Sequence, residues 1–297
     1  MDETQNDESI GEILRRVRKI ELVTRGLVRE TIGGEYHSSF KGQGIDFDDF
    51  REYQPGDEIR SIDWNVTARL NTPFIKKFAE ERELTVFLAV DVSASGNYGS
   101  QNRSKRELAA EVAALLAFSA ISNQDKVGLV LFSDTVELYL PPRKGTRHIL
   151  RIIREILFCK TPGHGTSLKP PLELLVTAAP RRALVFVLSD FVAGDFEQPL
   201  KIAAIKHDVV ALQIKDPAEH DLPDAGRVTL QDPETGEQVA VNTSSPGFRA
   251  AYAELADRWQ ENLDATFRAH SVDKILLQTG DDYLPALHSF FKNRTKR

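Results

Sequence analysis

The chain has 297 residues, 41% of them hydrophobic, and a formal net charge of −6 at pH 7. This length is enough to bury a full-sized core, and the acidic balance excludes a nucleic-acid-binding protein that depends on a strongly basic face. The single cysteine, Cys159, excludes an intramolecular disulfide and a cysteine-based zinc site. No apolar run approaches the ~18 residues that span a bilayer, and the polar, acidic start differs from a secretory signal. We therefore expect a cytoplasmic protein without a membrane span.

The first eighty residues differ in pattern from the rest of the chain. Apolar side chains recur there at helical spacing, which predicts an amphipathic helix docked on its own domain: Ile10, Ile13, Leu14, Val17 and Ile20. Farther along, Pro55-Gly56-Asp57 predicts a turn, because proline presets φ and glycine accepts a positive φ. Charged residues and Trp64 follow this turn, as in a partner-facing surface or in an ion-paired structural network. We expect residues 1–80 to form a helix and a further segment, packed on a main domain of residues 81–297.

From residue 83 onward, short buried strands alternate with helices. The predicted strands are apolar and lie at 84–90, 126–132, 183–188, 209–214 and 274–278. We expect an antiparallel hairpin between 126–132 and 136–140, and a surface hairpin between 227–230 and 238–241. The alternation of strands and helices implies βαβ crossovers. The sequence therefore predicts an α/β fold with a doubly wound, mostly parallel sheet.

Asp91, Ser93 and Ser95 occupy alternate positions where the first of these buried strands ends. In an open α/β sheet, ligands bind at the carboxyl ends of the strands. A hard cation such as Mg²⁺ prefers oxygen ligands, of which one or two are usually charged. The three side chains supply that chemistry, although the same pattern also suits a polar turn that caps the next helix.

Two later loops offer further oxygen ligands at the same edge of the predicted sheet. Thr166 follows the glycines of the loop 163–167, and Asp190 ends the buried strand 183–188 together with Ser189. This second buried strand therefore ends in an acid, as the strand before Asp91 does. This conjunction favours a metal site over a helix cap, with the ligand set Asp91, Ser93, Ser95, Thr166 and Asp190.

These ligand positions resemble the metal-ion-dependent adhesion site of the von Willebrand factor type A domain. The N-terminal motifs resemble a bacterial family labelled as domain of unknown function fifty-eight: Gly42-Gln43-Gly44, Asp46-Phe47, Arg51-Glu52-Tyr53, Pro55-Gly56-Asp57, Arg60, Ile62-Asp63-Trp64 and Ala68-Arg69. Members of that family couple this segment to a von Willebrand A-like domain and commonly accompany MoxR-type AAA+ ATPases. The chain departs from the family pattern at Gly96, where methionine is common, but the ligating residue types are intact.

The resemblance implies a function as well as a fold. The five ligands would hold Mg²⁺ (or Mn²⁺) and leave an open coordination position for an acidic residue of a partner protein. The chain would then be an adaptor, not an enzyme, that works with a MoxR-type AAA+ ATPase in protein remodelling or maturation. We expect no nucleic-acid partner.

Two other functions remain open at this point. A Mg²⁺-dependent hydrolase or phosphatase could use His164 as an acid or base, but no second aspartate stands beside Asp91 for phosphoryl transfer. The sequence also lacks a phosphate-binding Gly-x-x-x-x-Gly-Lys loop and a Gly-x-Ser-x-Gly elbow. The other alternative is a metal-free interaction scaffold, whose partner binding would not respond to EDTA.

Overall fold

The main body of the protein is built on a six-stranded sheet. The computed structural model describes residues 10–28, 33–40, 45–70, 72–80, 83–161, 165–194 and 196–294. The strand order is β10-β7-β6-β3-β4-β5, and every neighbouring pair is parallel except β4 with β5. The strands are β3 (Thr85–Asp91), β4 (Lys126–Phe132), β5 (Val136–Arg143), β6 (Leu184–Ser189), β7 (Asp208–Lys215) and β10 (Asp273–Gln278). The prediction of a doubly wound, mostly parallel α/β sheet is confirmed.

Helices cover both faces of this sheet, because alternate residues of the central strand point to opposite sides. Val86, Leu88 and Val90 of β3 belong to one core cluster, whereas Phe87 and Ala89 belong to the other. On the first face lie α4 (Lys105–Ser122), α5 (Thr146–Phe158) and α9 (Leu284–Arg294). On the second lie α6 (Lys169–Ala178), α7 (Glu197–Lys206) and α8 (Pro246–Ala269). The carboxyl edge of β3 therefore lies between two helical layers, where a ligand site is expected.

Two N-terminal helices, α1 (Ile10–Leu27) and α2 (Gly33–Ser39), pack on the first face. Arg16 of α1 forms an ion pair with Glu107 of α4, and the Arg25 guanidinium lies 5.3 Å from the ring centroid of Phe118. In α2, the buried ring of Tyr36 lies edge-on to Phe291 of α9, with 6.1 Å between centroids. These contacts dock both helices on the main body.

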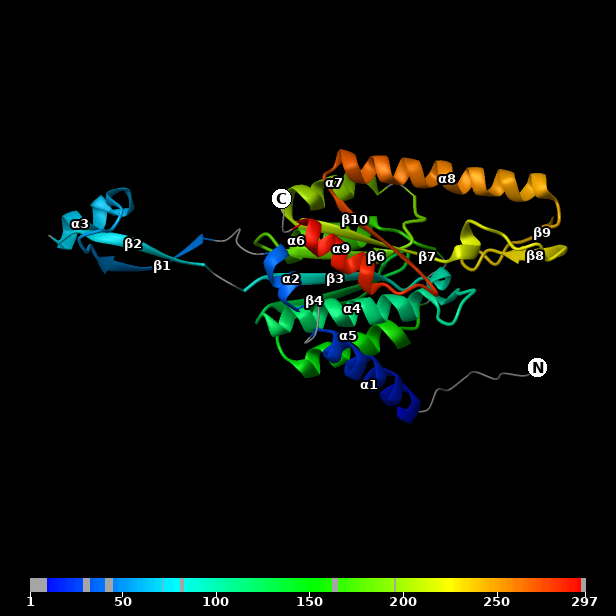
Figure 1. Ribbon diagram of the computed structural model, residues 1–297, viewed down its shortest axis with the longest axis horizontal. Coiled ribbons are helices and arrows are strands. Elements are labelled where there is room, and N and C mark those ends of the chain that lie inside the picture. Colours follow the sequence, from blue (N-terminus) through cyan, green and yellow to red (C-terminus); the bar gives the residue numbers. More distant parts are fainter. Residues whose placement is uncertain are drawn as a thin grey trace.

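The next segment forms a separate small unit. Strands β1 (Ile45–Glu52) and β2 (Phe74–Glu80) pair antiparallel, and η2 (Ile59–Ser61) and α3 (Trp64–Leu70) lie between them in the chain. Asp57 N donates to Gln54 O at 3.0 Å across the predicted turn. The Asp57 carboxylate accepts hydrogen bonds from Nη1 and Nη2 of Arg51, both at 2.8 Å. Figure 1 shows this unit to the left of the six-stranded sheet, pointing away from it. The described residues between 10 and 80 thus form two parts, helices packed on the main body and a projecting unit on which Trp64 is 67% exposed.

A second two-stranded sheet, of β8 (Arg227–Gln231) and β9 (Gln238–Asn242), is the predicted surface hairpin. Two short 3₁₀ helices, η3 (Ala94–Asn97) and η4 (Pro217–Glu219), follow β3 and β7. Both therefore lie beyond the carboxyl ends of central strands.

Asp125 is a buried acid that joins α2 to the start of β3, and it predicts a pH dependence of stability. Its Oδ1 accepts from the Leu84 N–H at 2.8 Å, and its Oδ2 accepts from the Tyr36 hydroxyl at 3.4 Å. Burial raises the pKa of Asp125 to about 6. Because the folded-state pKa exceeds the unfolded one, ionising Asp125 costs stability as the pH rises from about 4 to about 6, and the cost persists above that range.

We expect Asp125→Asn to be more stable than wild type at about pH 8, by roughly 1–2 kcal/mol, since the asparagine oxygen accepts from the Leu84 N–H and its NH₂ group donates to the Tyr36 oxygen without a buried charge. The advantage should shrink towards about pH 3, where Asp125 is protonated in both the folded and the unfolded state. Urea unfolding at several pH values measures it. An advantage that does not change with pH would contradict the assignment.

Candidate functional site

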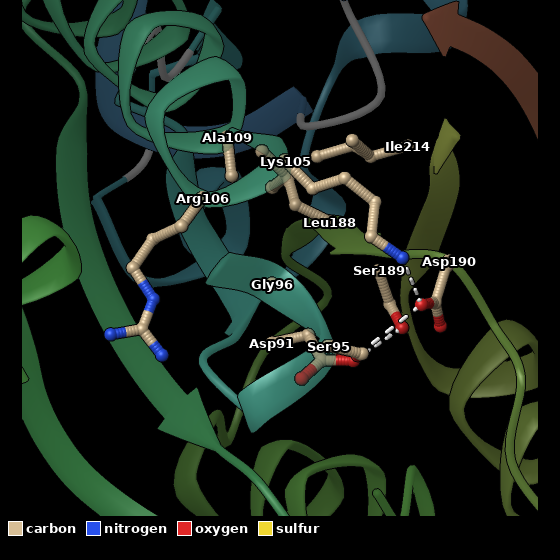
Figure 2. Close-up of a pocket in the computed structure, with 10 residues that line it drawn as sticks. All are labelled: Asp91, Ser95, Gly96, Lys105, Arg106, Ala109, Leu188, Ser189, Asp190 and Ile214. Carbon is tan, nitrogen blue, oxygen red and sulfur yellow. Dashed lines mark hydrogen bonds and ion pairs between the residues drawn. The ribbon is translucent and has the colours of Figure 1, made fainter. Parts of the chain in front are cut away.

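Asp91 is the last residue of β3, and its carboxylate is almost fully buried at the carboxyl edge of the sheet. Its Oδ1 accepts from the Ser93 N–H at 2.9 Å, and its Oδ2 accepts from the Ser189 hydroxyl at 2.7 Å. Ser189 ends β6, the strand paired with β3. Figure 2 shows the Asp91 carboxylate and the Ser189 hydroxyl meeting between the two strand ends. These bonds fix the orientation of the Asp91 carboxylate.

The two serines of the predicted motif lie beside this carboxylate. The hydroxyl oxygens of Ser93 and Ser95 are 3.0 Å apart. The Ser95 hydroxyl also donates to Asp190 Oδ2 at 3.4 Å. Neither serine caps the following long helix, because α4 is capped by Ser104 in a capping box with Glu107. The helix-cap interpretation of the motif is therefore wrong for α4.

Asp190 reaches the site through an unusual backbone turn. Phe191, the next residue, has a φ of 63°, a left-handed conformation that is uncommon for a bulky side chain. Its N–H donates to the Ser189 hydroxyl at 3.0 Å, and its buried ring packs edge-on against Phe267 with 5.1 Å between centroids. The Val192 N–H donates to Asp190 Oδ1 at 3.0 Å. Packing and hydrogen bonds thus hold a strained turn that directs Asp190 towards Ser95.

Lys105 adds a positive charge to the site, which the predicted ligand set did not include. Its Nζ lies 2.7 Å from Asp190 Oδ2 and 2.5 Å from Glu219 Oε1 of η4, and its side chain is 5% exposed. Burial alone would lower the pKa of Lys105, but the charges of Asp190 and Glu219 outweigh it, so its pKa lies above the ordinary value. One sequence signal was available, because a lysine directly after an N-capping serine faces the positive end of the helix dipole. A lysine in such a position needs a nearby acid to offset the unfavourable interaction with the helix dipole.

The electrostatics of the site are those of two close acids. Burial, followed by the charge of Asp190, raises the pKa of Asp91 to about 6, although hydrogen bonds from Ser93 and Ser189 oppose the shift. The Arg106 guanidinium gives this pair no direct bond, because it donates to the carbonyls of Val92, Ser93 and Cys159. Figure 2 shows Arg106 pointing away from both carboxylates. Among the described residues Asp91 has no ion-pair partner in direct contact, so a bound cation would stabilise its ionised form.

Of the five predicted ligands, Thr166 forms its hydrogen bond with a residue outside the predicted set. Its hydroxyl donates to Glu234 Oε1 at 2.5 Å, and Glu234 lies between β8 and β9. Thr166 is also absent from the described lining of the cavity between Asp91, Lys105 and Asp190. His164, the candidate acid or base, lies outside the described residues. The structure brings together Asp91, Ser93, Ser95 and Asp190 and connects Thr166 with the surface hairpin.

The four gathered side chains fit a hard divalent cation. Ligand oxygens at 2.0–2.1 Å from Mg²⁺ in octahedral geometry are about 2.9 Å apart along an edge, and the oxygen pairs here measure 3.0 and 3.4 Å. Two carboxylates and two hydroxyls are the donor types that Mg²⁺ and Mn²⁺ accept. Within the described residues, no three His, Cys, Asp or Glu side chains cluster so that they could hold a metal ion, so a ligand set at this edge depends on the serine hydroxyls as well as on the two acids. The ammonium of Lys105 is the feature that does not fit directly, since it already contacts Asp190.

The chain is similar to several known proteins. Over 283 residues it is 29% identical to "Uncharacterized protein Rv1480" of Mycobacterium tuberculosis strain H37Rv, covering 94% of this chain and 89% of that relative. Among solved structures, an aerotolerance-related membrane protein from Bacteroides fragilis NCTC 9343 is 16% identical, covers 72% of this chain and 100% of its own, and has a TM-score of 0.48. The SpRpn10 VWA domain is 11% identical, with coverages of 69% and 93% and a TM-score of 0.37.

The comparison corrects one expectation and establishes the family. The prediction of a cytoplasmic location is wrong on this comparison, because a structural neighbour is described as a membrane protein. In the parts of this chain that the structure describes, no helix is long and apolar enough to cross a membrane, and we assign no location. The sequence model of the family described as "Protein of unknown function DUF58" matches residues 49–262. The resemblance seen in the N-terminal motifs is confirmed, and the chain belongs to this family.

Proposed function

We propose that this chain is a protein–protein interaction adaptor that binds an acidic residue of its partner through a divalent cation at the β3 edge. The observation that supports it most is the convergence of Ser93, Ser95 and Asp190 oxygens, 3.0–3.4 Å apart, beside the buried Asp91. Asp91, Ser93, Ser95 and Asp190 would hold Mg²⁺ or Mn²⁺, and Thr166 would join them once released from Glu234. When bound, the cation supplies a coordination position for a partner carboxylate.

The chain's own residues prepare this surface for a partner. Asp91 is oriented by Ser93 and Ser189 before any ligand arrives, which limits the ordering cost of binding. Two apolar side chains stand exposed close to site residues in the chain: Tyr98 is 45% exposed and Val192 is 62% exposed. Exposed tyrosine and valine beside a polar centre suit a protein contact.

The geometry gives less support to a hydrolase. In the described part of the chain, the hydrogen-bond partners of the Ser93, Ser95 and Ser189 side chains are serine, aspartate and the Phe191 N–H. Serine nucleophiles are activated by an adjacent base such as histidine, and no described histidine contacts these hydroxyls. The adaptor therefore remains the better proposal.

The partner proposed from the family resemblance is a MoxR-type AAA+ ATPase or its protein client. The test is retention of the purified ATPase on immobilised wild-type chain, with millimolar Mg²⁺ or with EDTA. We expect retention in Mg²⁺ to fall at least tenfold in EDTA and in Asp91→Asn, because the carboxylate bond needs the cation. The control Asp221→Asn changes an exposed acid that pairs with His220 and should retain the ATPase like wild type. Retention that EDTA leaves unchanged would instead support a metal-free scaffold.

A further inference from the structure

Lys105 is a buried cation at the position where a metal ion would meet Asp190. We propose that Lys105 is an intrinsic counter-ion that competes with the divalent cation for Asp190, so that Asp190 pairs with one or the other. This inference rests on the proposed metal-binding function. Figure 2 shows the Lys105 side chain descending from α4 with its nitrogen directed at the Asp190 carboxylate.

The competition follows from the contacts of one carboxylate oxygen. Asp190 Oδ2 accepts two hydrogen bonds, one from Lys105 Nζ at 2.7 Å and one from the Ser95 hydroxyl at 3.4 Å. The other oxygen, Oδ1, accepts from the Val192 N–H. A cation that binds Ser95 and Asp190 together would therefore approach the oxygen that the ammonium contacts. Two positive charges at that distance in a buried site repel each other, so both cannot be held there at full strength.

Two features of its location make a positive charge on Lys105 energetically unfavourable, which suggests that the charge serves the site. It is the first residue of α4, where the helix dipole disfavours a cation, and burial of an unpaired ammonium is unfavourable. Asp190 and Glu219 offset both costs. Without a metal ion, Lys105 also prevents Asp190 from being a second unpaired acid next to Asp91.

Glu219 gives Lys105 a partner to keep when Asp190 is taken. Its Oε1 contacts Lys105, while its Oε2 accepts from the Asp216 N–H at 3.0 Å, which fixes the orientation of the carboxylate. The flexible lysine stem permits a small displacement from Asp190 towards Glu219. The state without metal then has Lys105 bridging two acids, and the metal-bound state has it paired with Glu219 alone.

The test compares Mg²⁺ and Mn²⁺ affinity in variants of opposite expected effect, by isothermal titration calorimetry on the full chain. Lys105→Met removes the competitor and should bind Mg²⁺ at least tenfold more tightly than wild type. Glu219→Gln removes the alternative partner, commits Lys105 to Asp190, and should bind Mg²⁺ more weakly. Lys201→Met, an exposed lysine on α7, is the matched control and should leave the affinity unchanged.

The outcomes separate this inference from the proposed function. Measurable binding in wild type that Lys105→Met does not tighten overturns the competition and leaves the metal site standing. If Lys105→Met fails to fold, Glu219→Gln still decides, because an affinity equal to or tighter than wild type overturns the inference. Absence of Mg²⁺ and Mn²⁺ binding in wild type and in both variants overturns the metal site, and the competition with it.

Discussion

Asp91→Asn is expected to abolish the stabilisation that Mg²⁺ gives to the wild-type chain. At a free Mg²⁺ concentration ten times Kd, binding stabilises the folded state by about 1.4 kcal/mol, which raises Tm by roughly 3 °C for a chain of this size. Asparagine keeps the hydrogen bond from the Ser93 N–H but removes the charge that would bind the cation. Thermal unfolding of both proteins, with Mg²⁺ and with EDTA, measures the effect.

In the absence of metal, Asp91→Asn is expected not to lower the stability of the fold. Burial and the Asp190 charge raise the pKa of Asp91 to about 6, so the ionised carboxylate destabilises the metal-free fold at neutral pH. Asp91→Asn in EDTA should therefore be at least as stable as wild type, which excludes misfolding as the reason for a lost Mg²⁺ response. Asp221→Asn should respond to Mg²⁺ like wild type. An equal Mg²⁺ shift in Asp91→Asn and wild type would refute the assignment of Asp91.

Asp216→Ala is expected to destabilise the fold by about 2–4 kcal/mol, because four hydrogen-bond donors lose a charged acceptor and one of them, the Thr279 hydroxyl, is buried. The Asp216 carboxylate accepts from the Ser100 N–H at 2.7 Å, the Ser100 and Thr279 hydroxyls at 2.5 Å, and the Ala218 N–H at 3.0 Å. It thereby joins the ends of β7 and β10 to the loop before α4. Urea unfolding measures the loss, and Asp216→Asn, which keeps one acceptor, should lose less.

The pH dependence of Asp216 has the opposite sign to that of Asp125. Burial alone would raise its pKa, but bonds from Ser100 and Thr279 to the charged form outweigh burial and lower it. Its contribution is therefore present at neutral pH and is lost as the pH falls below the ordinary aspartate pKa of about 4. A loss below about 1 kcal/mol in Asp216→Ala at neutral pH would show that the network is not a main support of this edge.

The central sheet was predictable because its signal is local. The strand expected at 126–132 is observed at Lys126–Phe132, and that expected at 84–90 is shifted by one residue to Thr85–Asp91. Continuous apolar runs define buried strands whatever their neighbours are. The pairing of β1 with β2 was not predicted, because their residues meet only after an intervening turn, η2 and α3.

For the candidate site, the sequence by itself determined the chemistry, since Asp91, Ser93 and Ser95 are close in the chain and their spacing after a strand places three oxygens at one edge. Only the tertiary structure decided what those oxygens meet. Lys105 and Asp190 are 85 residues apart, Lys105 and Glu219 are 114 apart, and Thr166 and Glu234 are 68 apart. Contacts over such separations depend on the packing of whole strands and helices, which no local pattern encodes. The charge balance of the site is therefore a property of the fold.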